Sequence, residues 1–146
     1  RHVEDGAFAL GVISGIGLKK GAIATTVAHD CHNINIVGTN PEDMALCAEA
    51  LKEMGGGFVA VDSGKVVAKV QLEIAGLITE RTYEEVVDEL ETFETLIRSD
   101  FGFPDDLEIV VFNFIALQSS PFKAAMTDKG LIDVYTQSII PLIKEN

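Results

Sequence analysis

The sequence of 146 residues has no tryptophan, few cysteines and less than half as many basic as acidic residues. Its two cysteines, Cys31 and Cys47, are too few for the disulfide framework of a small secreted domain. We therefore expect reduced thiols and a cytoplasmic location. The 11 Lys and Arg against 23 Asp and Glu give a net charge of −12. A field of this sign repels phosphate backbones and anionic lipids, which excludes nucleic acids and membrane surfaces as partners.

Several motifs of other protein classes are missing as well. No apolar run reaches the roughly 18 residues that a membrane helix needs. The start, Arg1 to Asp5, has neither a signal-peptide pattern nor an initiator Met, and we expect a part of a longer chain. No serine lies in the Gly-x-Ser-x-Gly elbow of hydrolases. The glycines between Gly11 and Gly21 lack the spacing of a phosphate-binding loop, and a strand follows where a helix should begin.

The composition is that of a globular protein, with 47% hydrophobic and 23% charged residues, and its length fits a single domain spanning residues 1–146. Apolar runs rich in β-branched residues predict strands, and Asp62-Ser63-Gly64-Lys65 has the composition of a hairpin turn. We expect strands at 7–13, 22–28, 34–37, 58–61, 66–72 and 107–117, turns at 19–21 and 127–130, and a short apolar segment at 131–134.

Two helices are predicted from capping residues and from apolar spacing. Asn40 and Pro41 favour a helix start, and the glycines at 55–57 favour its end. Thr82 and Glu85 have the spacing of a capping box, which begins a second helix that runs to about residue 99. Residues 135–144 are ambiguous, and a terminal helix is one reading. The order of elements predicts an α+β fold, a mainly antiparallel β-sheet with helices packed on it.

The densest group of chemically active side chains is His29-Asp30-Cys31-His32-Asn33, at the end of a predicted strand. Chemistry is often displayed at strand ends and in loops, and these residue types bind metals or transfer protons. In an extended strand they alternate between two faces and do not converge without a turn. Three interpretations stay open: a structural polar turn, a contribution to an active site completed by another domain, and an independent metal site.

The stretch from Gly15 to Asn33 resembles the C-terminal domain of microbial adenine deaminase. The family reads Gly-Phe-Gly-Leu-Lys, Gly-Ala-Ile-Ala and Ala-His-Asp-Ser-His-Asn where this chain has Gly-Ile-Gly-Leu-Lys, Gly-Ala-Ile-Ala and Ala-His-Asp-Cys-His-Asn. Cys31 therefore stands where the family more often has Ser, and a thiol is the poorer hydrogen-bond donor. The match continues in order at residues 37–40, 42–45, 55–57, 74–77 and 127–131.

This resemblance implies part of an amidohydrolase superfamily enzyme of purine salvage, which converts adenine and water to hypoxanthine and ammonia. It implies Mn or Fe, held by a barrel domain that precedes this one, to turn bound water into the attacking hydroxide. Such a barrel uses a His-x-His pair, whereas His2, His29 and His32 are not so spaced. We therefore expect no metal site in this chain, and no activity without the barrel domain, whether the chain is excised or encoded separately.

Within that enzyme, we expect His29, Asp30, His32 and Asn33 to face the barrel and to orient the substrate or a metal ligand. The expected partners are the barrel domain, adenine as the substrate of the whole enzyme, and further copies of the chain. The apolar stretch from Phe8 to Val27 is the reason to expect a homo-oligomer. Two other functions stay open: a non-catalytic interaction or oligomerisation module, and a stand-alone domain that binds a small molecule through the cluster.

Overall fold

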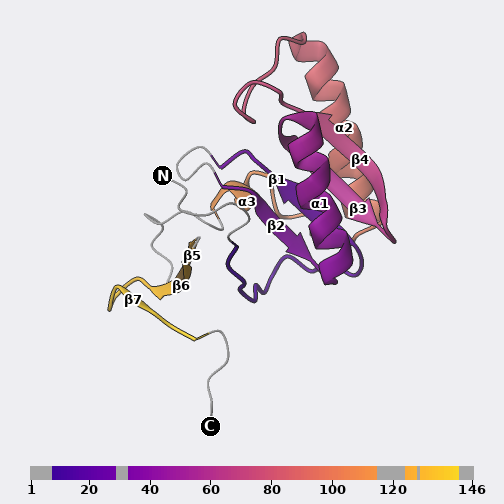
Figure 1. The fold of residues 1–146 in the computed structure, drawn as a ribbon. Coiled ribbons are helices and arrows are strands. Elements are labelled where there is room, and N and C mark those ends of the chain that lie inside the picture. Colours follow the sequence, from indigo (N-terminus) through magenta and orange to yellow (C-terminus); the bar gives the residue numbers. More distant parts are fainter. Residues whose placement is uncertain (1–7, 29–32, 115–123, 128, 142–146) are drawn as a thin grey trace.

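The computed structural model describes residues 8–28, 33–114, 124–127 and 129–141 (Figure 1). Its main sheet contains β1 (Ala22–Thr25), β2 (Asn35–Gly38), β3 (Gly57–Asp62) and β4 (Lys65–Gln71). The helices are α1 (Pro41–Met54), α2 (Tyr83–Ser99) and the short α3 (Val111–Phe114). A second, smaller sheet contains β5 (Ala124–Thr127), β6 (Gly130–Asp133) and β7 (Ser138–Ile139).

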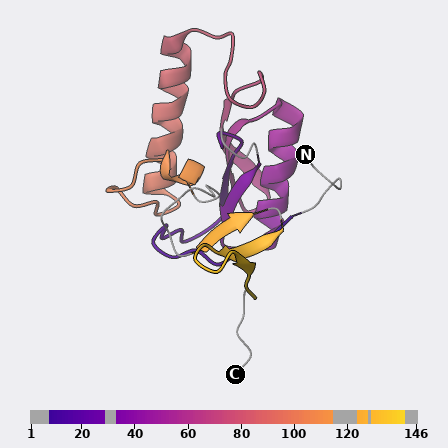
Figure 2. The same cartoon turned by 90° about the vertical axis from the view of Figure 1, so that its left-hand side faces the viewer.

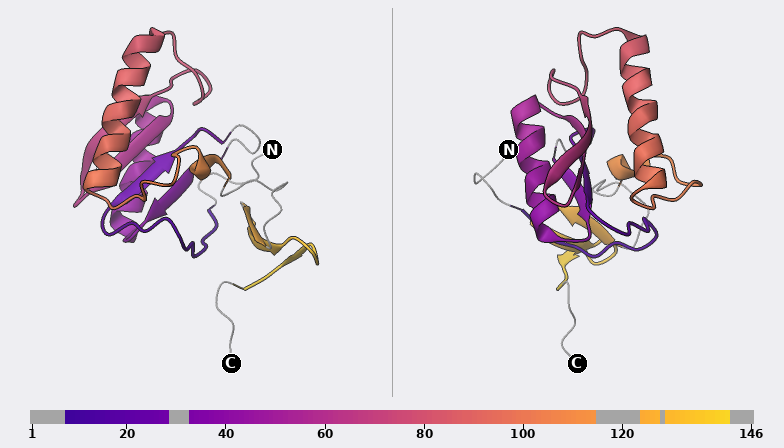
Figure 3. Two further views of the ribbon diagram at one scale, coloured as in Figure 1. Left: turned by 180° about the vertical axis from the view of Figure 1, so that it is seen from behind. Right: turned by 90° about the vertical axis from the view of Figure 1, so that its right-hand side faces the viewer.

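The main sheet has the strand order β2-β1-β3-β4, and every neighbouring pair is antiparallel. The helices α1 and α2 cover its opposite faces, as the right-hand view of Figure 3 shows. This three-layer arrangement confirms the predicted α+β fold. Within the sheet β1 is central, because Ile23 pairs with Val37 of β2 on one side and with Ala60 of β3 on the other.

The two faces of the sheet bury separate groups of side chains, because successive residues of a strand point to opposite sides. On the α1 side, Ala22, Ala24, Val59 and Val61 pack against buried residues of α1 that include Leu51. The α2 side is the larger cluster, and aromatic rings fill it. Its buried members include Ile23, Phe58, Ala60, Val70, Phe93, Ile97, Phe101, Phe103 and Phe112.

Local capping signals place both long helices as predicted. The Asn40 side chain accepts a hydrogen bond from the Asp43 N–H at 2.8 Å, and Gly55 ends α1 in the left-handed conformation with φ +82°. At the start of α2, Thr82 and Glu85 form the reciprocal capping box, which satisfies two free N–H groups of the first turn. The face of α2 turned away from the sheet is solvated, since Glu84, Asp88 and Glu91 are exposed.

The hairpin of β3 and β4 turns through Ser63 and Gly64, with φ values of +53° and +74°. Positive φ at both central residues is the geometry that matches the twist of two-residue hairpins. The predicted hairpin is therefore confirmed. The predicted turn at 127–130 is also found between β5 and β6, although Asp128 lies outside the described residues.

The strand predicted at 7–13 is wrong for residues 8–13, which form an extended segment outside both sheets. The expected hairpin partner, β1, is paired by β2 on one edge and β3 on the other, so no edge is left for this segment. The strand predicted at 22–28 ends at Thr25, and the one predicted at 34–37 is shifted by a residue. The turn predicted at 19–21 therefore joins no two strands.

The strand predicted at 107–117 is also wrong for its described part, residues 107–114. Ile109 and Phe112 are both buried in the α2-side cluster, three residues apart, which is the spacing of a helical turn rather than of a strand. Residues 135–141 hold a turn and β7 instead of the possible helix. There Asp133 accepts hydrogen bonds from the N–H groups of Tyr135 and Thr136, which reverses the chain.

Among the helices of the described residues, none is both long enough and apolar enough to cross a bilayer.

Candidate functional site

The polar cluster at His29–Asn33 falls in the connection between β1 and β2. His29, Asp30, Cys31 and His32 lie outside the described residues, and Asn33 is half-buried just before β2. Thr25 pairs with Asn35, so the chain reverses direction between them. The cluster thus belongs to the connection between two antiparallel strands.

Thr26 fixes the start of this connection to two other segments. Its hydroxyl donates to the Gly76 carbonyl oxygen at 2.6 Å and accepts from the Gly57 N–H at 2.8 Å. The Thr26 N–H in turn donates to the Gly57 carbonyl oxygen at 3.0 Å. One side chain therefore joins the end of β1, the start of β3 and the loop that follows β4.

The glycines around Thr26 allow this close approach. A Cβ at Gly76 would lie 2.8 Å from the Thr26 Oγ1, and a Cβ at Gly56 would lie 2.5 Å from the Gly76 Cα. Such distances are shorter than van der Waals contact, so side chains at these positions would push the segments apart. Gly56 and Gly76 also have positive φ, of +115° and +70°, which favours glycine.

Asn35 fixes the other end of the connection. Its amide Nδ2 donates to the Phe112 carbonyl oxygen at 3.0 Å, in a buried position. This bond ties the first residue of β2 to α3 and satisfies a backbone acceptor next to the aromatic core. On the β1 side, the buried Thr25 hydroxyl accepts from the Val27 N–H at 2.9 Å. Both ends of the connection are therefore held by side-chain hydrogen bonds.

The loop after β4 is ordered by its own hydrogen bonds. Ile74 and Ile78 exchange backbone bonds of 2.9 and 3.2 Å, and the Glu73 carboxylate accepts from the Thr79 hydroxyl at 2.8 Å. Bonds from its own N–H, from Thr79 and from the Glu80 N–H lower the pKa of Glu73. Arg81 closes the loop by donating to the Gln71 carbonyl oxygen at 2.7 Å. The loop therefore gives Thr26 a fixed acceptor.

Cys47 is the free cysteine among the described residues, and it is fully buried in α1. Burial, with the nearby Asp43 charge, raises the pKa of its thiol to about 12, so the thiolate is scarcely formed at neutral pH. Asp43 itself serves the fold, since it accepts from the Gly64 N–H at 2.8 Å and ties α1 to the β3–β4 turn. The reduced thiol expected at Cys47 is confirmed, and Cys31 lies outside the described residues.

Other places for chemistry are few in the part of the chain that the structure describes. There, no three His, Cys, Asp or Glu side chains come close enough together to bind a metal ion. A shallow depression runs along the outer face of α2, lined by Asp88, Glu91, Ser99 and Asp100 among others. These carboxylates belong to the solvated face of the helix.

Sequence reasoning located the cluster but missed the residues that hold its connection. Nothing near Thr26 or Asn35 in the sequence indicates their partners, which lie 50 and 77 residues further along. The sequence did contain one signal of this close packing, since glycines often mark a close backbone approach. It lies in the glycines at 55–57 and in the Ala75-Gly76 pair.

These features define an α+β domain with a four-stranded antiparallel sheet between two helices and a polar connection held at both ends. The chain belongs to the adenine deaminase C-terminal domain family, whose sequence model matches residues 1–138. It is 45% identical to an adenine deaminase of Brucella anthropi and 44% identical to one of Bdellovibrio bacteriovorus, each over 92% of this chain. It is 43% identical, over 99% of its length, to an adenine deaminase of Methanothrix thermoacetophila. The chain spans 22–25% of the length of these three relatives.

Proposed function

We propose that this chain is the single C-terminal domain, residues 1–146, of a metal-dependent adenine deaminase in the cytoplasm. The enzyme hydrolyses adenine to hypoxanthine and ammonia for purine salvage. Family membership carries the proposal, because similarity to adenine deaminases extends over nearly the whole chain. Family membership favours this function over the two alternatives, a non-catalytic module and a stand-alone binding domain, because neither alternative has an observation in its favour.

In this reaction, a water oxygen bonds to the ring carbon that carries the amino group, and the amino group leaves as ammonia after it takes up a proton. Mn or Fe, bound in the preceding barrel domain, would supply the attacking hydroxide. The residues of this chain do not fit such a centre, because its three histidines include no His-x-His pair and its described residues bring no ligand group together. We assign no metal to this chain.

We assign a positioning role to His29, Asp30, His32 and Asn33 at the interface with the barrel domain. The support is the connection itself, whose ends are fixed through Thr26 and Asn35. Fixed ends limit the entropy that a loop loses when its side chains take up one arrangement. Imidazole and carboxylate groups in such a loop orient a substrate amine or a metal ligand by hydrogen bonds.

Release of ammonia from adenine tests the proposal. The chain is assayed alone, and then together with the part of the Methanothrix thermoacetophila adenine deaminase that precedes the matched region, both with Mn(II). We expect no turnover from the chain alone and much faster turnover from the mixture than from the preceding part alone. Turnover by the chain alone, or no gain on mixing, contradicts the proposal.

Alanine variants test the positioning role in the same mixture. His29→Ala and His32→Ala should each lower kcat/KM by about 10-fold or more, as loss of an orienting hydrogen bond does. His2→Ala is the matched control, because it removes the histidine outside the cluster, and it should leave kcat/KM unchanged. Equal rates for all three variants, with unchanged folding, contradict the role.

A further inference from the structure

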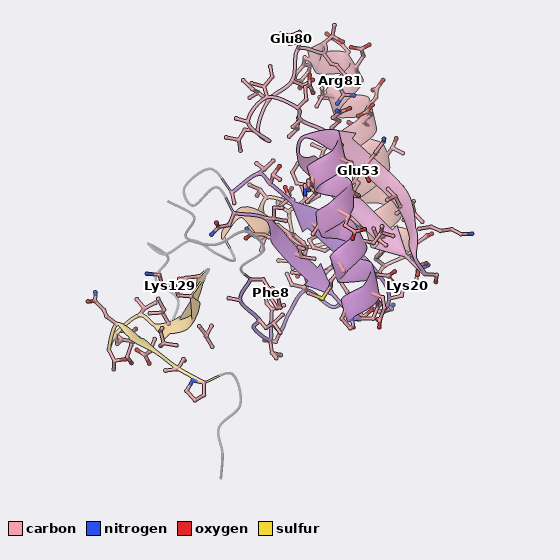
Figure 4. The ribbon with its side chains drawn as sticks, in the orientation of Figure 1. Phe8, Lys20, Glu53, Glu80, Arg81 and Lys129 are labelled. Atoms are coloured by element: carbon pink, nitrogen blue, oxygen red, sulfur yellow. The ribbon has the colours of Figure 1, made fainter. Side chains whose placement is uncertain are left out.

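Exposed apolar side chains occur at several places, among them β4 and the loop that follows it, and one group of them lies on the side of β2. Residues 8–14 contain no charged side chain, and Phe8, Leu10 and Val12 are exposed by 79%, 57% and 85%. Figure 2 looks at this side, where β6 and β7 lie in front of the main sheet and α1 and α2 flank it. In Figure 4, Phe8 marks the N-terminal segment and Lys129 marks the small sheet, and Lys20 lies across the molecule from Lys129.

The described side chains of the small sheet form little core of their own. Its strands have four, four and two residues, the side chains of residues 130–134 are only half-buried, and Tyr135 and Ile139 are exposed by 77% and 63%. Small antiparallel sheets need a covered apolar face to be stable in water. No helix of the described residues lies over this sheet in Figures 1 and 3. We therefore expect the exposed face of this small sheet to be covered by another surface.

The edge of the main sheet on the same side is open as well. Among the described residues, β2 pairs with β1 alone, so its outer edge presents backbone N–H and C=O groups. Ile34, just before β2, is 44% exposed. Proteins usually shield a bare strand edge with charge, proline or a covering segment, and residues 34–38 contain neither charge nor proline.

We propose that this surface, made by residues 8–13, Ile34 and the β6–β7 hairpin, is where the domain docks onto the preceding part of an adenine deaminase polypeptide. This inference rests on the proposed function. The matched relatives are about four times as long as this chain, and the matching family is that of their C-terminal domains. The remaining length therefore precedes the matched region, which begins at residue 1, shortly before the apolar segment 8–13. Obligate interfaces between protein chains are more apolar than other surfaces, and the exposed Phe8, Val12 and Ile139 give this surface the same character.

Binding of the full chain to the preceding part of the Methanothrix thermoacetophila enzyme tests the surface. We compare Phe8→Glu, Val12→Glu and Ile139→Glu with the control Tyr83→Glu. Tyr83 lies at the start of α2 and is 78% exposed, as closely matched to Phe8 as the chain offers. All four positions are exposed, so urea midpoints should stay at the wild-type value and confirm that folding is intact.

We expect the three surface variants to bind at least 10-fold more weakly than the wild type, and Tyr83→Glu to bind within twofold. The inference is overturned if Phe8→Glu binds normally, if Tyr83→Glu weakens binding equally, or if the wild-type chain does not bind. It is also overturned if sedimentation shows a homodimer that Phe8→Glu dissociates, since a second copy then occupies the surface. A complex that forms as expected but releases no ammonia contradicts the proposed function and leaves the docking surface standing.

Discussion

Replacing Thr26 by valine tests whether one hydroxyl holds three segments of the domain together. Valine has nearly the same shape but neither donates nor accepts a hydrogen bond. The variant loses the 2.6 Å bond to the Gly76 carbonyl oxygen and the 2.8 Å bond from the Gly57 N–H. Both glycines are buried, so water replaces neither bond easily.

The size of the effect follows from these two bonds. A hydrogen bond contributes about 0.5–1.5 kcal/mol net, and a buried polar group left without a partner costs about 1–3 kcal/mol. Thr26→Val should therefore lower the free energy of unfolding by about 2–4 kcal/mol. A small domain has about 5–15 kcal/mol in total, so the variant should still fold.

Urea denaturation followed by circular dichroism measures this loss, with two controls. Thr26→Ser keeps the hydroxyl and loses one methyl group, so it should cost no more than about 1 kcal/mol. Thr92→Val makes the same chemical change at an exposed hydrogen bond, from the Thr92 hydroxyl to the Asp88 carbonyl oxygen, and should stay within about 0.5 kcal/mol of the wild type. A Thr26→Val variant as stable as the wild type, or a Thr26→Ser variant as unstable as Thr26→Val, refutes the reasoning.

Three further predictions concern the fold. Gly57→Ala should cost about 4 kcal/mol or more, because its Cβ would lie 1.9 Å from the Val70 carbonyl oxygen. Gly64→Ala, at φ +74° in open space, should cost only about 1–2 kcal/mol, and equal urea midpoints would contradict this contrast. Bonds from Asn40 and then Gly64 lower the pKa of Asp43, so its contribution is complete above the unfolded value of about 3.9 and is lost as pH falls through the folded pKa. The gap in urea midpoint between wild type and Asp43→Asn should therefore narrow on acidification, and a widening gap would count against it. In a Cys31→Ser background, Cys47 should react with a thiol reagent at pH 8 only after denaturant is added, and rapid labelling without it would refute the burial argument.

The sequence predicted those parts of the fold that local chemistry decides. The Asn40 cap, the Thr82–Glu85 capping box and the Ser63-Gly64 turn each satisfy backbone groups within a few residues. Because donor and acceptor are close in the sequence, their spacing alone carries the information. The helices and the β3–β4 hairpin accordingly begin and end within a residue or two of the expected positions.

Apolar runs without such signals were misassigned, for a reason that lies outside the runs themselves. Residues 8–13 and 107–114 are as apolar as a buried strand, but a strand also needs a free edge to pair with. Both edges of β1, the strand expected to pair with the first run, are occupied, so that run forms no hairpin with β1. The second run covers the aromatic core through Ile109 and Phe112. Which edge is free is a property of the whole sheet, and periodicity does not record it.

For the candidate site, too, the sequence predicted one part and missed another. Residue types placed the cluster at the end of a strand, and the structure puts it in the connection that follows β1. The bonds of Thr26 and Asn35, which fix that connection, join residues 50 and 77 positions apart. Long-range pairs of this kind arise from tertiary packing, so a single sequence does not specify them.

The proposed positioning role of the cluster and the proposed docking surface both involve β2. The cluster connection leads directly into this strand, and the docking surface includes Ile34 beside the cluster and the open edge of β2 itself. A partner seated there lies next to Asn33 and Ile34, where the connection joins β2, and the ends of the connection are already fixed by Thr26 and Asn35. Docking would therefore add little loss of loop entropy, and most of the binding free energy would remain available to orient the imidazole and carboxylate groups. Under the two proposals, this coupling accounts for a connection held at both ends and an exposed apolar surface on the same side of the domain.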